Sequence, residues 1–458
     1  LVNDPAAVQT YLALSRVGAT HVPMNTRLTR SDLEYILRDA NARYLVTDPA
    51  FLDEARELRT RLGTLEWIII TAGPSETIGQ PVDREWSAVD LMDTGDETIE
   101  LPHVADESPA TIMYTSGTTG FPKGVVRSHR ANLWNVVNSA LGSPRTPTDV
   151  EVFTLPIFGI GFMHFVMPAL LAGATVVVDH SFEPKRTWRL IEDSEATRVF
   201  LAPTMLDSML RVSTDVRSDV SKLEIVYTAY EFPARLRTEA LEVFGDIFVY
   251  MYGLTEAQLT CGQPGEFAAS PTSVGKAMGL MRVRILDDLG HEVPPGSVGE
   301  IALEGPALMT GYHGLPEATA EVLSDGWLRT GDLGYLAADS NLHYTGRKKE
   351  MIKSGGYSVD PFEVERAILT LERIREAVVV GLPDEHWGEA VVAVVSPPGV
   401  ATEEQLREHC KDRLADFKVP KRVIFLDELP KNATGKYERG KIRDIGSTGS
   451  GASDATMP

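Results

Sequence analysis

The chain has 458 residues, and its 44 Lys and Arg against 65 Asp and Glu give a formal net charge of −21. An apolar share of 43% and a charged share of 24% are ordinary for a globular protein and exclude a wholly disordered chain. So acidic a chain does not suit duplex nucleic acid, whose phosphates need basic partners, although a small anion can still bind in a locally positive cleft.

The first half of the chain predicts alternating helices and strands. Ser31 and Glu34 form a capping-box pattern, which marks the start of a helix. The segments predicted further along are the strands 44–47 and 67–70, the helix 233–244 and the strand 247–252. This alternation predicts a mainly parallel sheet covered by helices, and therefore an α/β domain.

The pattern changes in the second half. Between 270 and 345, apolar and polar residues alternate between turn-forming Asp, Gly and Pro, which predicts a β-rich subdomain. Beyond it, Asp360 can cap a helix, and Thr402 with Gln405 can cap another, so a small α+β domain is expected. The predicted units are a large domain over 1–345, a hinge at 346–349, a small domain over 350–445 and a disordered tail over 446–458.

Cysteine usage and hydropathy limit the surroundings of the protein. The two cysteines, Cys261 and Cys410, cannot build a disulfide framework or a thiolate metal site, which fits a reducing compartment and predicts a cytoplasmic protein. No apolar run reaches the ~20 residues that a membrane span needs. Because the chain begins at Leu1 without a signal segment, we expect its true N-terminus to be missing.

The strongest motif is Tyr114-Thr-Ser-Gly-Thr-Thr-Gly-Phe-Pro-Lys-Gly124. Its glycines allow the backbone to approach an anion, its hydroxyls can donate to phosphate oxygens, and Lys123 adds positive charge. It is not a Walker loop, because Pro122 precedes the lysine and Gly124 follows it. The predicted phosphate-binding residues are Thr115, Ser116, Gly117, Thr118, Thr119, Gly120 and Lys123.

This segment resembles the phosphate loop of the acyl-adenylate-forming (AMP-binding) superfamily, which includes acyl- and aryl-CoA synthetases, adenylation domains of peptide synthetases and firefly luciferase. Further motifs of that family follow in order, and the resemblance covers the chain except its tail, without the family's stretch before Leu1. They are Tyr252-Gly-Leu-Thr-Glu256, Gly326-Trp-Leu-Arg-Thr-Gly-Asp332, Gly346-Arg-Lys-Lys-Glu350 with Lys353-Ser-Gly-Gly356, and Pro430-Lys-Asn-Ala-Thr-Gly-Lys436.

The resemblance implies roles for the residues of the ATP site. Glu256 is an oxygen ligand suited to Mg²⁺, and the resemblance pairs it with Thr115. It places Asp332 at the ribose hydroxyls, Arg347 at the ribose or phosphates, and Lys436 as the catalytic cation, which suits charge that develops only during the reaction. The remaining ATP contacts that it implies are Tyr230, Glu231, Tyr252, Gly253 and Thr255.

The resemblance also implies a second site, for coenzyme A. Lys349 is the expected hinge about which the small domain reorients between two half-reactions. Ser354, Gly355 and Gly356 would then approach the pantetheine arm, for which a plain β-turn is the alternative. A nucleotide of CoA could bind the cluster Trp387, Phe417, Lys418 and Lys421, for which an ordinary solvated charge run is the alternative.

The segment after residue 155 bears on the acid. Gly159 stands where amino-acid-activating relatives carry an Asp, so α-amino acids are disfavoured. An apolar or aromatic pocket could be lined by Phe158, Gly159, Ile160, Phe162, Met163 and Tyr230, which could equally be core residues.

These observations predict an ATP-dependent carboxylic acid:CoA ligase that uses ATP, Mg²⁺ and coenzyme A, with a role in fatty-acid and lipid metabolism if the acid is a fatty acid. Three alternatives remain open: loading of an acyl group on a carrier protein, luciferase-like oxidation of the adenylate, and nucleotide binding without catalysis. No nucleic-acid partner and no transmembrane segment are expected, and the sequence does not indicate the oligomeric state or the identity of the acid.

Overall fold

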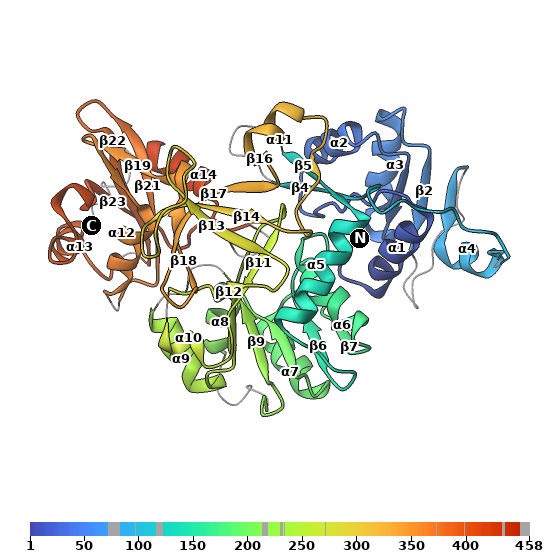
Figure 1. The fold of residues 1–458 in the computed structure, drawn as a ribbon, viewed down its shortest axis with the longest axis horizontal. Helices are drawn as coiled ribbons and strands as arrows, with labels where there is room; N and C mark the ends of the chain where they lie inside the picture. Colours follow the sequence, from blue (N-terminus) through green and yellow to red (C-terminus); the bar gives the residue numbers. More distant parts are fainter. Residues whose placement is uncertain are drawn as a thin grey trace, which may run out of the picture.

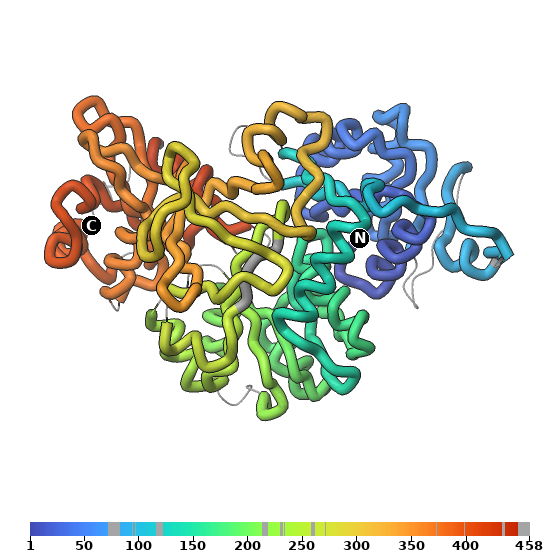
Figure 2. Tube along the Cα trace, in the orientation of Figure 1, coloured from blue at the N-terminus to red at the C-terminus, as the bar shows by residue number. Residues whose placement is uncertain are grey.

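The computed structural model describes residues 1–71, 83–96, 98–115, 122–212, 219–229, 232, 234–270, 272–371, 373–397, 399–432 and 436–448. Figure 1 shows the N-terminal elements at one end, the small C-terminal domain at the other, and the strands β13 (Arg282–Leu286), β14 (Gly299–Glu304) and β17 (Trp327–Leu336) between them. Figure 2 follows the same path as a tube, from blue through green and yellow to red. Among the described helices, none combines the length and the apolar character needed to cross a membrane.

The N-terminal part is built on three parallel strands, β1 (Tyr44–Thr47), β2 (Trp67–Ile70) and β3 (Glu85–Ser87), of which the first two lie where the sequence predicted strands. The capping-box prediction was wrong in its residues. The pair is Thr29 and Asp32, whose side chains each accept from the other's backbone N–H at 3.3 and 3.1 Å. The helix starts at Arg30, so Ser31 already lies inside it.

The helices of the large domain cover its sheets. They are α1 (Pro5–Val17), α2 (Arg30–Asp39), α3 (Leu52–Arg61), α4 (Ala88–Thr94), α5 (His129–Gly142), the π-helical turn Phe162–Val166 with α6 (Met167–Leu171), α7 (Pro184–Asp193), α8 (Pro203–Leu210), α9 (Ala234–Phe244), α10 (Glu266–Ala269) and α11 (Pro316–Val322).

A seven-stranded sheet forms the centre of the large domain, in the order β12-β11-β10-β9-β8-β6-β7. The strands are β6 (Val150–Phe153), β7 (Thr175–Val178), β8 (Arg198–Phe200), β9 (Ile225–Thr228), β10 (Phe248–Gly253), β11 (Gln258–Cys261) and β12 (Lys276–Ala277). The pairs from β7 to β10 are parallel, as predicted, and β11 and β12 are antiparallel. The motif Tyr252–Glu256 therefore begins in the last two residues of β10, at the carboxyl end of a parallel strand, where α/β sheets bind ligands.

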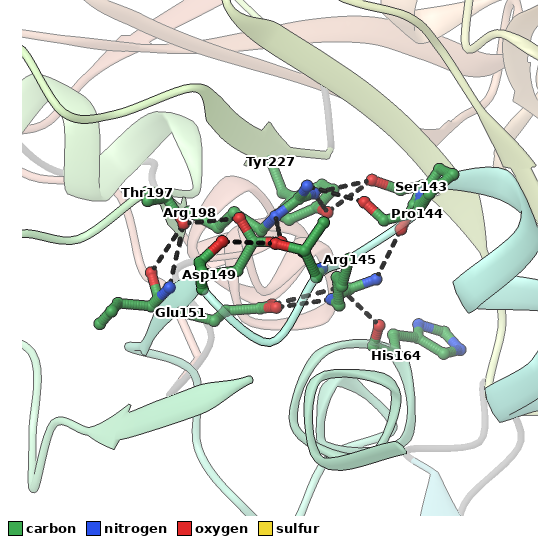
Figure 3. Close-up of polar contacts among 12 residues, drawn as sticks. Ser143, Pro144, Arg145, Asp149, Glu151, His164, Thr197, Arg198 and Tyr227 are labelled. Carbon is green, nitrogen blue, oxygen red and sulfur yellow. Dashed lines mark hydrogen bonds and ion pairs between the residues drawn. The ribbon is translucent and has the colours of Figure 1, made fainter. Parts of the chain in front are cut away.

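A buried polar network pins the opposite, amino-terminal ends of β6 and β8 (Figure 3). Arg145 pairs with Glu151 at 2.7 Å, with both side chains almost wholly buried. Arg198 pairs with Asp149 at 3.3 Å and donates to the Tyr227 hydroxyl at 2.9 Å. The carboxylates and guanidinium groups compensate one another, as buried charges must.

Two antiparallel sheets complete the large domain. The first joins β13 (Arg282–Leu286), β14 (Gly299–Glu304), β16 (Leu323–Ser324), β17 (Trp327–Leu336) and β18 (Leu342–Arg347), which confirms a β-rich subdomain. The second joins β4 (Pro109–Thr115), β5 (Lys123–Ser128) and β15 (Gly311–Tyr312).

In the described residues, the small domain is a mixed sheet with three α-helices. Its elements are β19 (Ile352–Ser354), β20 (Tyr357–Val359), α12 (Pro361–Leu369), β21 (Glu376–Asp384), β22 (Gly388–Ser396), α13 (Glu403–Lys411), β23 (Arg422–Phe425) and α14 (Arg439–Thr448). Both predicted caps are present, from Asp360 and from Thr402 with Gln405, and Cys410 is buried in the core. The large α/β domain with a small α+β domain is thus the predicted fold class.

The predicted tail differs from the structure at its start. Helix α14 continues through Thr448, so residues 446–448 are helical. Gly446 packs so closely that a Cβ would lie 3.0 Å from Leu382. The amino-acid composition of the segment, from which a disordered tail was predicted, does not reveal this packing. Residues 449–458 lie outside the described part of the chain.

Candidate active site

The predicted phosphate loop joins β4 to β5. Thr115 and Lys123 are cross-strand partners in this antiparallel pair, and the Thr115 hydroxyl donates to the Lys123 carbonyl at 3.5 Å. The ends of the loop therefore lie side by side. The residues predicted between them, Ser116, Gly117, Thr118, Thr119 and Gly120, lie outside the described residues.

Tyr312 connects this loop to the Tyr252–Glu256 motif. The Lys123 ammonium lies 4.9 Å from the centre of the Tyr312 ring, and the Tyr312 hydroxyl donates to Glu256 Oε1 at 3.0 Å. Burial raises the pKa of Tyr312, and the Glu256 charge raises it further. Lys123 and Glu256 are thus brought to one place by a residue that the motifs did not indicate. Only the pairing of β15 with β5, which no local pattern reveals, puts Tyr312 there.

A second cluster joins three of the predicted ATP-site residues, Tyr252, Asp332 and Arg347. Asp332 lies opposite Arg347 across the β17–β18 pair, and its Oδ1 is 3.0 Å from Arg347 Nε. Its Oδ2 accepts from the Tyr252 hydroxyl at 2.6 Å. Burial raises the pKa of Asp332, whereas Arg347 opposes that rise. Asp332 is only 2% exposed. The sequence did not predict the hydrogen bond from Tyr252 to Asp332.

Lys436 comes from the small domain to the same cluster. Its backbone is fixed by Asn432, which accepts from the Lys436 N–H at 3.0 Å and donates to the Lys436 carbonyl at 2.8 Å. Although the residue keeps an exposed surface, desolvation lowers the pKa of its ammonium to about 8; Arg347 also lowers it, while Glu350 and Asp332 oppose the change. The cation and the buried carboxylate thus share one electrostatic environment across the two domains.

Arg439 anchors the segment that carries Lys436. Its guanidinium pairs with Glu365 at 2.6 Å and with Glu350 at 3.2 Å, and it lies 4.3 Å from the Phe362 ring centre. Because Glu365 is only 4% exposed, the pair is tightly fixed. Sequence reasoning missed Arg439, although its place three residues after Lys436 was a usable signal.

The predicted hinge lies where the domains meet. Lys349 falls in the single turn Lys348–Glu350, next to Lys348, which pairs with Asp288 at 2.9 Å. Gly346 touches the start of α12, since an added Cβ would lie 2.9 Å from Asp360 Oδ1. The small domain therefore packs directly on the last strand of the large one.

The predicted CoA residues lie together on the small domain. Gly355 and Gly356 form the turn between β19 and β20 with φ of +58° and +82°, preceded by the buried Ser354. Gly355 donates to the Trp387 carbonyl at 2.8 Å, and the Lys421 ammonium is 4.7 Å from the Trp387 ring centre.

Two further members of that cluster have partners of their own. Phe417 stacks on Tyr357 with ring centres 4.4 Å apart, and Lys418 pairs with Glu363 at 2.6 Å. The backbone thus forms a two-glycine hairpin turn, with Trp387 packed against Gly355 and Phe417 stacked on Tyr357.

The residues proposed for the acid pocket divide into two groups. Phe162 and Met163 are 3% and 0% exposed within the central core, and Phe162 contacts Tyr11, so the core explanation holds for both. Phe158, Gly159 and Ile160 are partly exposed after the carboxyl end of β6. Tyr230 and Glu231 lie outside the described residues.

The residues present fit a magnesium ion bound together with phosphates. Glu256 Oε1 accepts from Tyr312, while no described residue donates to Oε2. The described residues contain no cluster of three or more His, Cys, Asp and Glu that could hold a metal without other ligands. One carboxylate and the Thr115 hydroxyl are enough where phosphates and water complete the shell, as is usual for Mg²⁺.

Comparisons with known proteins cover nearly the whole chain. Residues 1–313 match the AMP-binding enzyme family, and residues 363–436 match the AMP-binding enzyme C-terminal domain. Indoleacetate–CoA ligase from Aromatoleum aromaticum is 36% identical over 97% of this chain and 86% of its own length. Feruloyl-CoA synthase from an Amycolatopsis species is 34% identical, over 96% and 87%. A fatty acid–[acyl-carrier-protein] ligase, ScoC from Streptomyces coeruleorubidus, is 35% identical, over 94% and 82%.

Solved structures agree in fold. The amide bond synthetase McbA from Marinactinospora thermotolerans superposes with a TM-score of 0.87 at 31% identity, over 97% of this chain and 88% of that one. ATP-bound MatB from Rhodopseudomonas palustris gives 0.85 at 29% identity, over 97% and 86%. The match to this family and the ATP-bound relative support ATP binding, and the chain belongs to the AMP-binding enzyme family of adenylate-forming enzymes.

Proposed function

We propose that the chain is a ligase that joins an aromatic carboxylic acid to coenzyme A at the expense of ATP. The observation that supports it best is the electrostatic interaction of Lys436, from the small domain, with Asp332 and Arg347 of the large one. A cation in that environment would act near the pair that we expect to hold the ribose. The two CoA-forming relatives at 36% and 34% identity support the thiol acceptor.

The first half-reaction makes an acyl-adenylate. A carboxylate oxygen attacks the α-phosphorus of ATP, and pyrophosphate leaves. Both reactants are anions, so Lys123 and Lys436 reduce their repulsion and stabilise the charge that develops on the phosphate oxygens. When bound, Mg²⁺ neutralises phosphate charge, and Glu256 and Thr115 would hold it.

The second half-reaction releases AMP. The CoA sulfur adds to the acyl carbonyl, the carbon–oxygen bond to AMP breaks, and the thiol gives up its proton. We propose that the small domain turns about Lys349 for this step. The turn at Gly355 and Gly356 would then approach the pantetheine arm, and the Trp387 surface would take the nucleotide.

The proposed acid class follows from charge and from the relatives. Gly159 supplies no carboxylate for an ammonium, which disfavours α-amino acids. The partly exposed Phe158 and Ile160 offer apolar surface at the carboxyl end of β6. The names of the two relatives refer to aromatic acids, indoleacetate and ferulate. We therefore propose an aromatic acid as the substrate, ahead of a fatty acid.

Acid-dependent exchange of labelled pyrophosphate into ATP tests the proposal. Aromatic, short, medium and long acids are compared without CoA, and AMP release is then followed with CoA. We expect exchange with aromatic acids and CoA-dependent AMP release. Lys436→Ala should reduce exchange by about 10²- to 10³-fold while ATP still binds. No exchange with any acid would refute the proposal.

A carrier protein is the second candidate acceptor, because ScoC is 35% identical to the chain. Offering a phosphopantetheinylated carrier protein, free CoA and an amine in separate reactions distinguishes the acceptors. If a thioester forms only on the carrier protein, or an amide forms only with the amine, that compound is the acceptor in place of CoA. The proposed adenylation step would be unaffected by either result.

A further inference from the structure

Arg127 is a fully buried arginine at the end of β5, with 0% of its surface exposed. Its guanidinium donates to the carbonyls of Ala307 at 2.9 Å and Thr255 at 3.1 Å, and to Asn132 Oδ1 at 2.9 Å. None of these acceptors is charged. Within the described ranges, no carboxylate forms an ion pair with it, although a buried charge normally has such a partner.

One of the two carbonyls belongs to the segment that contains Glu256, and the other belongs to a remote segment that is hydrogen-bonded to it. Thr255 directly precedes Glu256 in the chain. Ala307 lies two residues before Met309, whose N–H donates to the Glu256 carbonyl at 2.8 Å. One guanidinium therefore ties both segments to the start of α5.

Arg127 also interacts electrostatically with the Glu256 carboxylate. Burial lowers the pKa of Arg127 to about 10, and Tyr11 and the Glu256 charge oppose that fall. A planar guanidinium can donate to several acceptors in fixed directions. A lysine ammonium, which is a compact point charge, cannot reproduce this set of hydrogen bonds.

We propose that Arg127 is a positioning residue, which holds the Thr255–Glu256 turn in the geometry that binds a nucleoside triphosphate with its divalent cation. The inference rests on the proposed function, in which this turn faces the phosphates. Arg127 itself is behind the turn and touches no reacting group.

Arg127→Met tests the inference, with Arg127→Lys as the conservative variant. The matched control is Arg145→Met, which removes another buried arginine, paired with Glu151 near the amino ends of the strands (Figure 3). Calorimetric titration with ATP and Mg²⁺, without an acid, gives the dissociation constant. Thermal melting of each variant measures stability separately.

For Arg127→Met we expect about 10- to 100-fold weaker binding of ATP with Mg²⁺, the range for losing hydrogen bonds from a charged donor. Arg127→Lys should recover part of it, and the KM for the acid should change little. Arg145→Met should melt earlier and bind ATP as the unmodified protein does.

Wild-type affinity in Arg127→Met, or equal weakening in Arg145→Met at matched loss of stability, would overturn the inference. If Arg127→Met does not fold, the same comparison between Arg127→Lys and Arg145→Lys decides. Failure of the unmodified protein to bind ATP would instead refute the proposed function, and the inference with it.

Discussion

Gly346→Ala tests whether adenylation needs the small domain to pack on β18 as it does here. An alanine Cβ would lie 2.9 Å from Asp360 Oδ1 and 3.2 Å from Phe362 Cδ2, both at the start of α12. Asp360 cannot move away freely, because its side chain accepts from the Phe362 N–H at 3.0 Å and so caps the helix.

Overpacking of this kind costs about 1–3 kcal/mol, or roughly 5- to 150-fold in the population of this arrangement. If adenylation takes place in this arrangement, its rate should fall by that factor. The thioester step, for which we propose a different arrangement of the domains, should keep its rate. Rapid-quench single turnovers measure the two steps separately, the second with acyl-adenylate supplied.

Gly440→Ala is the control, because nothing lies within 4 Å of a Cβ at that position in α14. Alanine there should leave both steps unchanged and stabilise the helix slightly. Unchanged adenylation in Gly346→Ala, or an equal loss of both steps, would refute the reasoning about the domain contact.

Three more outcomes are expected. Because the pKa of Lys436 is about 8, its protonated fraction falls as the pH rises through that value, so kcat/KM for ATP should decline above it. The Lys436→Arg variant, whose side chain stays charged, should be less active, but its kcat/KM for ATP should not decline above pH ~8. A wild-type kcat/KM that stays constant up to pH ~10 would contradict a lowered pKa for Lys436, since the ordinary pKa of lysine lies near that value. Lys349→Pro should slow the thioester step more than adenylation, since proline fixes the backbone at the hinge, and equal slowing in single turnovers would remove the hinge role. Trp387→Ala should raise the KM for CoA by about 5- to 150-fold, as expected for a lost base stack, and leave the KM for ATP unchanged; an unchanged KM for CoA would exclude Trp387 from that site.

Local features of the fold could be predicted because their signals lie within a few residues. The strands 44–47 and 67–70 have continuous apolar patterns, and the caps at Asp360 and Thr402 depend only on the next turn of helix. The capping box at Thr29 shows the limit of such reasoning. The observed pair, Thr29 and Asp32, lies two residues before the predicted pair, Ser31 and Glu34, because the helix begins at Arg30.

The site shows a similar division. The motifs named Glu256, Asp332, Arg347 and Lys436, because each residue type suits its chemistry and stands in a recognisable local order. The side chains that contact these residues and their neighbours come from distant segments, and the motifs did not indicate these contacts. Tyr252 donates to Asp332, Tyr312 donates to Glu256, and Arg127 donates to Thr255.

The sequence by itself determined the two-domain fold class, the family and the residue types of the site, since these depend on periodicity and on short motifs. Tertiary structure alone decided that Phe162 is a core residue, that Lys436 influences Asp332 electrostatically, and that Arg127 donates to the Thr255 carbonyl. The physical reason is that strand pairing and side-chain burial depend on which remote segments meet, and no local pattern encodes those meetings.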